Sequence, residues 1–311
     1  MNSNQPIVHE DLSLYGLFSI FIKNWLILTV SGFSFAVAAL IWSLYQPNIY
    51  KAETLLMPVE NDKSSLSGLA GNIGGLASLA GVNLSDSGNN NSKLAIELLK
   101  SRKFLTHFIE KNDLLIPLMA VKSWDITSNK LLIDQAVYNS DKQQWVRKAK
   151  APRNAKPSLI EAYEKLITML EVDIEPKTKF VRISLEYFSP DLAAQWTQSL
   201  VAMLNEEVRM MDKKEAEESI VYLKQLASEA NVAGLRNVFS SLMEEQIKSQ
   251  MLAEIRKDYV FKVVDPAIAP ELKSKPRRAI IVVVAGFLGG IIGIIIVLFR
   301  TGRKSYISSK V

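Results

Sequence analysis

Two stretches without a charged residue lie near the two ends of the chain. The first runs over residues 25–45 and the second over 279–299, so each has about the ~20 residues that a helix needs to cross a bilayer. Trp42 and Tyr45, at the end of the first stretch, suit the aromatic belt at a membrane surface. The pattern predicts two membrane-spanning helices, with residues 46–278 as one large loop between them.

A cleaved signal peptide is the alternative for the first stretch. Such a peptide has a shorter apolar core, a more basic start and a small-residue cleavage site, whereas Gln46, Pro47 and Asn48 follow here. We therefore expect the first helix to be retained. Residues 1–24 form a cytoplasmic segment in this interpretation, and its apolar run from Leu12 to Ile22 predicts a short interfacial helix.

The loop alternates between strand and helix patterns, which predicts an α+β fold. Residues 49–59 have strand alternation, with one face made by Tyr50, Ala52, Thr54 and Leu56. The other predicted elements are a helical pattern over 93–111, an amphipathic helix over 159–170, and a β-hairpin whose strands span 170–175 and 180–188.

A long helical hairpin is predicted after this hairpin of strands. Ser189 and Pro190 signal a helix start, and about 40 residues of helical periodicity follow without a proline. A second helix then returns towards a strand over 259–264. The middle of the first helix, from Glu206 to Glu218, is too charged for a core, so the hairpin should project from its domain. We expect an α/β base over 46–188 and 258–270, with the hairpin over 189–257.

The segment over 265–278 is expected to connect the domain to the last span as a stiff, extended chain. Pro266, Pro270 and Pro276 fix φ and remove backbone donors, so this connector cannot form an ordinary helix or an inner strand. We expect these prolines to set the junction between the domain and the membrane.

The last span carries two overlapping GxxxG pairs. Gly286 pairs with Gly290, and Gly289 pairs with Gly293. Such pairs let a second helix approach closely in lipid, although glycine is also simply common in membrane helices. We expect these four glycines to pack the span against a partner helix.

The basic charge of the chain lies beside the last span. Of 37 basic residues, eight flank that span, leaving 29 against 32 acidic residues elsewhere, although the whole chain carries +5. This pattern indicates a membrane flank and not a nucleic-acid footprint. The tail over 300–311 is basic and short, whereas long loops translocate largely regardless of charge. Both termini are therefore expected in the cytoplasm, with the loop in the periplasm.

Residues that could support catalysis are sparse. The chain has no cysteine and no GxxxxGK[ST], GxSxG or HExxH motif, and the glycine-rich tract over 64–92 lacks GxGxxG and predicts a loop. His9 and His107 fall on opposite sides of the membrane. Acidic pairs such as Glu206-Glu207 and Glu244-Glu245 are adjacent on helices and point apart. We expect no enzyme, no cofactor and no metal site.

Several of these segments together resemble the polysaccharide co-polymerases, specifically the Wzz-type chain-length determinants of the O-antigen class. The resemblance rests on residues 50–56, on 180–185 followed by Ser189 and Pro190, and above all on 253–271 leading into the glycine-bearing span. The tract over 67–81 also looks like the family. Some relatives append a cytoplasmic tyrosine kinase, but twelve residues without a phosphate loop follow Phe299, so we expect the kinase-free branch.

The resemblance implies a homo-oligomer in the bacterial inner membrane, with projecting helices that form a bell-like periplasmic assembly. It implies a Wzy-type polymerase, a lipid-linked glycan and membrane lipids as partners, and control of how long the glycan grows. Capsule or common-antigen polysaccharide is an alternative polymer. Two other classes are disfavoured: a two-span sensor, since the ends leave no room for a signalling domain, and a periplasmic glycan enzyme, since no catalytic set is found.

Overall fold

The computed structural model describes residues 24–59 and 87–308. The chain divides into two compact units, one made of residues 1–48 with 274–311 and the other of residues 49–273. The predicted interfacial helix over 12–22 and the glycine-rich tract up to residue 86 lie outside the described residues.

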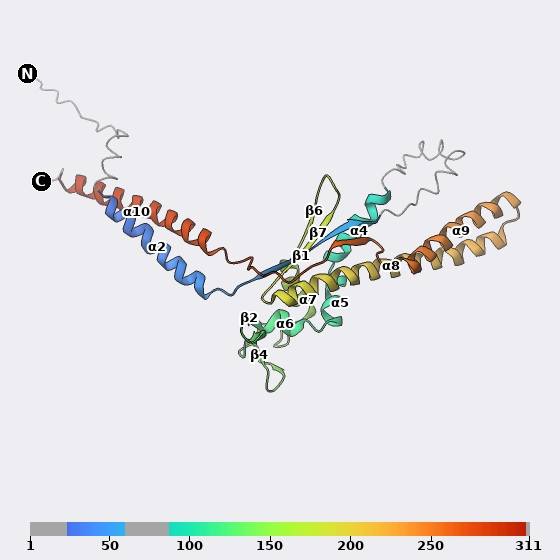
Figure 1. The fold of residues 1–311 in the computed structure, drawn as a ribbon, viewed down its shortest axis with the longest axis horizontal. Helices are drawn as coiled ribbons and strands as arrows, with labels where there is room; N and C mark the ends of the chain where they lie inside the picture. The colour runs from blue at the N-terminus through green and yellow to red at the C-terminus, as the bar shows by residue number, and fades with distance from the viewer. Residues whose placement is uncertain (1–23, 60–86, 309–311) are drawn as a thin grey trace, which may run out of the picture. The chain divides into compact units, whose positions relative to one another are not determined.

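The first unit is a pair of apolar helices. Helix α2 (Trp25–Tyr45) packs against α10 (Arg278–Ser308), as Figure 1 shows. By length and composition, two helices of the described chain could cross a membrane, over residues 25–45 and 278–300. Both predicted spans are therefore helical, and α10 continues past the apolar stretch to Ser308.

The second unit is built on a four-stranded sheet whose neighbouring strands are antiparallel (Figure 1). Its spatial order is β6 (Leu170–Ile174), β7 (Val181–Tyr187), β1 (Tyr50–Pro58) and β8 (Phe261–Asp265). The chain therefore returns from the far end of the sequence to pair with its first strand, because β8 is hydrogen-bonded to β1.

The alternation along β1 separates its two faces. The predicted face is confirmed, since Tyr50, Ala52, Thr54 and Leu56 are all buried. The β6–β7 hairpin is also confirmed, and its register sets Leu170 opposite Leu185. The core under the sheet consists of residues that are fully enclosed, among them Leu56, Leu99, Leu105, Phe108, Leu166, Ile183, Leu185 and Leu200.

The helical pattern over 93–111 is two helices rather than one. Helix α4 spans Ser87–Lys100 and α5 spans Arg102–Lys111. The break falls at Ser101, whose extended backbone and hydroxyl cap α5 by accepting a hydrogen bond from Phe104 N. The expected loop is also too long, because α4 begins at Ser87 and buries Ser92 and Ala95.

The remaining elements of this unit are short. Helices α6 (Leu115–Ala120) and α7 (Leu159–Met169) complete the set beside the sheet. Two small hairpins lie between them in sequence: β2 (Val121–Asp125) with β3 (Lys130–Ile133), and β4 (Tyr138–Asn139) with β5 (Gln144–Trp145).

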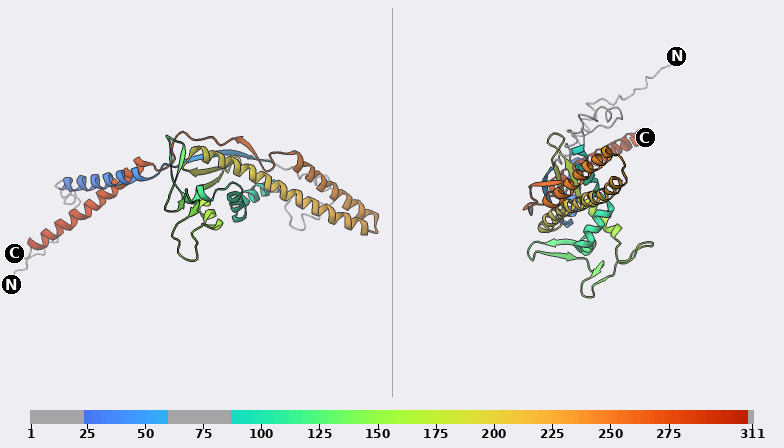
Figure 2. Two further views of the ribbon diagram at one scale, coloured as in Figure 1. Left: turned by 90° about the horizontal axis from the view of Figure 1, so that it is seen from below. Right: turned by 90° about the vertical axis from the view of Figure 1, so that its right-hand side faces the viewer.

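A long helical hairpin leaves the sheet, as Figures 1 and 2 show. Helix α8 (Pro190–Glu229) has 40 residues, and Ser189 caps it by accepting a hydrogen bond from Leu192 N. Its first turns bury Trp196, Leu200 and Leu204 in the core. Beyond them α8 continues alongside α9 (Ala233–Ile255), which leads back to β8. The α+β fold with a projecting helical hairpin is confirmed.

Candidate functional site

The glycines of α10 lie at very different distances from α2. A methyl group built on Gly289 would be 2.7 Å from Cβ of Phe35, and one on Gly293 would be 3.3 Å from Cα of Leu28. A side chain at Gly289 therefore requires a neighbour on α2 to shift, and one at Gly293 requires its neighbours to move by a few tenths of an ångström. Together with Val297, these two glycines form a buried stripe at four-residue spacing.

The other predicted pair behaves differently. A methyl group on Gly286 would make an ordinary contact, 3.6 Å from Cβ of Ala36. At Gly290 it would meet nothing within 4 Å. In the described structure, therefore, a side chain at Gly286, Gly289 or Gly293 would meet α2 of the same chain, whereas Gly290 has open space at its Cβ position.

The matching face of α2 includes the small residues Ser31, Gly32 and Ala36, which were not predicted from the sequence. A methyl group on Gly32 would lie 3.2 Å from the backbone oxygen of Gly286, and Ala36 faces the same residue. Ser31 adds a polar contact, since its hydroxyl donates a 2.7 Å hydrogen bond to the carbonyl of Gly289. Small residues four apart on this span were the signal that could have identified α10 as the partner of α2.

The three prolines of the connector lie in different environments. Pro266, directly after β8, is exposed, and Pro270 is half-buried. Pro276 is buried, two residues before α10 begins. Between them the carbonyl of Ala267 accepts a 2.6 Å hydrogen bond from Gln198 Nε2, which holds the start of the connector against α8.

Asn205 fixes the return of the hairpin to the sheet. Its Oδ1 accepts hydrogen bonds from the backbone N–H groups of Val260 and Phe261, at 3.0 and 2.9 Å. Its Nδ2 donates to the carbonyl of Phe261 at 2.8 Å. Asn205 is buried, so one amide satisfies three buried backbone groups at the point where the chain enters β8.

Polar contacts continue this attachment along α8. The hydroxyl of Tyr259 donates a 2.7 Å hydrogen bond to Asp212 Oδ2, and burial together with this carboxylate raises the pKa of Tyr259. Further along, Lys213 forms a 3.0 Å ion pair with Glu254 of α9. The charged middle of α8 is therefore partly matched by groups on the returning helix.

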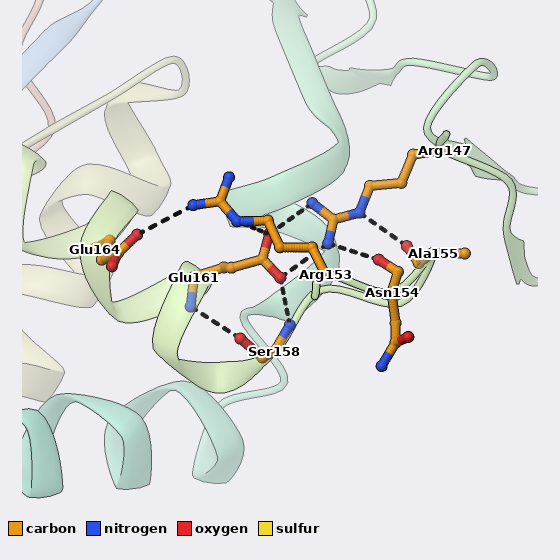
Figure 3. Close-up of polar contacts among 7 residues, drawn as sticks. All are labelled: Arg147, Arg153, Asn154, Ala155, Ser158, Glu161 and Glu164. Atoms are coloured by element: carbon orange, nitrogen blue, oxygen red, sulfur yellow. Dashed lines mark hydrogen bonds and ion pairs between the residues drawn. The ribbon is translucent and has the colours of Figure 1, made fainter. Parts of the chain in front are cut away.

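A second polar cluster ties the segment before α7 to that helix (Figure 3). Arg147 donates to the carbonyls of Asn154 and Ala155 and forms a 2.9 Å ion pair with Glu161. Glu161 also accepts from Ser158 N, while Ser158 Oγ accepts from Glu161 N, which makes a capping box. One glutamate thus joins a helix cap to a loop.

The ion pair between Arg147 and Glu161 should make the stability of the folded protein depend on pH. The hydrogen bond from Arg147 lowers the pKa of Glu161 from its ordinary value of 4.5. Because the pKa of Glu161 is lower in the folded state than in the unfolded state, the ion pair stabilises the fold fully at pH values above the unfolded pKa. This stabilisation is lost as the pH falls through the folded pKa. We expect Glu161→Gln to lower the Tm at neutral pH by roughly 5 °C.

The measurement is a thermal melt of the purified full-length protein in detergent across a series of pH values. The difference in Tm between wild type and Glu161→Gln should shrink between about pH 5 and pH 3. Glu164→Gln is the matched control, because its carboxylate is exposed and lies 3.9 Å from Arg153. A difference that stays constant with pH would contradict the role given to Glu161.

The residues considered for catalysis do not converge in the described structure. His107 is exposed on α5, and Glu206 pairs with Arg209 on its own helix. Over residues 24–59 and 87–308, no three His, Asp or Glu side chains are grouped as metal ligands would be. The contacts found instead hold helices and strands together.

Comparisons with known proteins give two sequence families and a set of solved structures. Residues 10–112 match the family model "Chain length determinant protein" (Wzz), and residues 217–302 match "G-rich domain on putative tyrosine kinase" (GNVR). No curated protein sequence matches the chain. The sequence has no GxxxxGK[ST] phosphate loop.

Two of the similar structures are a "full-length bacterial polysaccharide co-polymerase" and a fragment of WzzB, a polysaccharide co-polymerase from Salmonella Typhimurium. The first is 14% identical, with 94% of this chain and 99% of that one covered and a TM-score of 0.38. The second is 11% identical, with 73% and 100% covered and a TM-score of 0.28.

The family of the chain follows from the two sequence models. The two models lie at opposite ends of the chain, and between them they match more than half of it. The first contains α2 and β1, and the second contains α9, β8 and the apolar part of α10. The chain belongs to the Wzz-type chain-length determinant family of polysaccharide co-polymerases.

Proposed function

We propose that this chain is a non-enzymatic regulator, in the bacterial inner membrane, of the length of lipopolysaccharide O-antigen. It acts with a Wzy-type polymerase on a lipid-linked glycan. The observation that carries this proposal is the family match at both ends of the chain. The described contacts support it, because polar side chains such as the buried Asn205 and the half-buried Glu161 join structural elements.

The proposed topology places residues 46–278 in the periplasm and both termini in the cytoplasm. Two helices of the right length and composition support two spans. The basic tail beyond residue 300 supports the orientation, since short basic segments stay on the cytoplasmic side. Pro266, Pro270 and Pro276 would then set the passage from the domain into the second span.

We propose a homo-oligomer in which projecting hairpins of neighbouring copies meet. The support is a set of large apolar side chains that stay exposed on the hairpin of a single chain: Met210, Met211, Val221, Tyr222, Leu235, Val238, Leu242 and Met251. Exposed apolar surface of this extent on a soluble part marks a contact with another molecule.

The test is a gel profile of surface lipopolysaccharide from a strain deleted for this chain, with and without a plasmid copy. The expected result is a random ladder in the deletion strain and a defined modal band on complementation. If the ladder stayed unchanged while capsule or common antigen changed length, the O-antigen assignment would be wrong and that polymer would replace it. If no glycan changed, the proposal would fail.

A further inference from the structure

We propose that the start of α10 binds a phosphate group carried by a membrane lipid, through Arg278 and Ser43. If the lipid is the carrier of the glycan, this site rests on the proposed function; a site for an ordinary phospholipid does not depend on it. Both residues belong to the unit made by the two apolar helices.

Arg278 is a partly buried cation whose hydrogen-bonding capacity is largely unused. Its Nη2 donates a 3.3 Å hydrogen bond to Asn48 Oδ1, while its Nε is buried and has no partner in the described structure. None of the ion pairs among the described residues involves it. A guanidinium offers five N–H donors and no acceptor, so its remaining partners must be acceptors, preferably anionic.

Ser43 is a second buried group without a partner. The residue has no exposed surface, and its hydroxyl makes no hydrogen bond in the described structure. In contrast, two other hydroxyl groups of α2 do form hydrogen bonds, since Thr29 donates to the carbonyl of Leu26 and Ser31 donates to the carbonyl of Gly289. An unpaired buried hydroxyl costs free energy, which a ligand oxygen would recover.

The register of the helix pair places these two residues at the same end of the pair. Ala36 faces Gly286 across the interface. Ser43 lies seven residues after Ala36, and Arg278, which is half-buried, lies eight before Gly286; because seven or eight residues make about two helical turns, both return to the contacting face near the same end of the helix pair. Ser43 therefore lies level with the first turn of α10, where Arg278 begins the helix.

The ligand class follows from charge and depth. A helix N-terminus carries partial positive charge, which adds to the guanidinium and favours an anion. Arg278 is the first residue of a 23-residue segment that could span a membrane, so it is expected at the level of the lipid headgroups, which carry the phosphates. A lipid phosphate matches the planar guanidinium with two oxygens and leaves a third for the hydroxyl.

Two sources share this chemistry: the headgroup of a phospholipid and the pyrophosphate that joins a glycan to its polyprenyl carrier. Arg277 offers a matched control, since it is the neighbouring arginine in the same basic flank but is exposed. A general attraction of the flank for anionic lipid would depend on both arginines alike.

The experiment is native mass spectrometry of the full-length protein in detergent with three added lipids: phosphatidylglycerol, polyprenyl pyrophosphate and diacylglycerol, which lacks phosphate. Wild type and Arg277→Gln should retain a phosphate-bearing lipid. Arg278→Gln should bind it about tenfold more weakly, and Ser43→Ala about threefold more weakly. A disulfide between Ala36→Cys and Gly286→Cys, placed in each variant, checks that the helices remain paired.

Retention of both phosphate lipids would support a general lipid-phosphate site, and retention of polyprenyl pyrophosphate alone would support a site for the glycan carrier. Equal binding of diacylglycerol, equal losses in the two arginine variants, or full binding by Arg278→Gln would overturn the proposal. The lipopolysaccharide profile is read separately: an unaffected ladder in the deletion strain defeats the proposed function and leaves the lipid measurement standing.

Discussion

Replacing Gly289 by leucine is expected to push the two membrane helices apart and to reduce strongly the yield of a disulfide engineered between them. The methyl position of Gly289 already lies 2.7 Å from Cβ of Phe35 and 3.0 Å from the backbone oxygen of Ser31. A leucine there must push α2 away, which also breaks the hydrogen bond from Ser31 to the Gly289 carbonyl. Close packing and such polar contacts are what hold helices together in lipid.

The disulfide pair that reports on this contact is Ala36→Cys with Gly286→Cys. The Cβ positions lie 3.6 Å apart, within the range that a disulfide requires, and the chain has no cysteine of its own. Gly289→Leu should reduce the yield of oxidised protein to about a tenth, since helix contacts of this kind are worth about 1–2 kcal/mol. The yield is measured by non-reducing gel mobility after mild oxidation of membranes.

Alanine variants provide the matched comparison. Gly290→Ala should oxidise like the parent because its methyl group meets nothing within 4 Å, whereas Gly289→Ala should already lose yield. The two substitutions have the same chemistry and adjacent positions, so a difference in helix propensity cannot separate them. Equal yields in both would refute the packing described for the two spans.

The second large effect is expected at Asn205. Alanine there leaves two buried N–H groups, of Val260 and Phe261, and the Phe261 carbonyl without their partner. An unsatisfied buried group costs about 1–3 kcal/mol, and together they should lower the Tm of the full-length protein by roughly 10 °C. Because the lost bonds fasten the chain at the entry to β8, the hairpin should also become more sensitive to protease.

Asn237→Ala is the control for this substitution. Asn237 is exposed on α9, and alanine is the better helix former, so its Tm should stay within about 1 °C of wild type. Thermal melts and limited proteolysis of the two purified variants give the comparison. A melt of Asn205→Ala that overlays the control would mean that Asn205 does not anchor the hairpin.

The hydrophobic periodicity of the sequence, together with residues that begin and end helices and strands, predicted much of the fold. The buried face of β1, the β6–β7 hairpin and the 40-residue α8 with its Ser189 cap could all be read from local patterns. Such elements depend on residues close in sequence. The break at Ser101 was missed because the apolar spacing of α4 and α5 continues across it, while the cap depends on one hydroxyl and one N–H group.

The sites were less predictable, since they join residues far apart in the chain. The GxxxG pairs indicated a close partner for the last span but not which helix supplies it, nor that Gly290 has no neighbour at its Cβ position. Asn205 and Arg147 looked like ordinary polar residues on a helix and in a loop. Their roles arise from partners more than 50 residues away for Asn205 and from a helix cap for Arg147.

The most direct test of the account is the lipopolysaccharide profile of the deletion strain complemented by matched variants. Wild type and Gly290→Ala should restore a modal band of the same length. Gly289→Leu should leave the random ladder of the deletion strain, provided that it is produced at the same level in the membrane. A deletion strain with an unaltered modal band would contradict the role in chain length. A modal band restored by Gly289→Leu would contradict the part given to the paired spans.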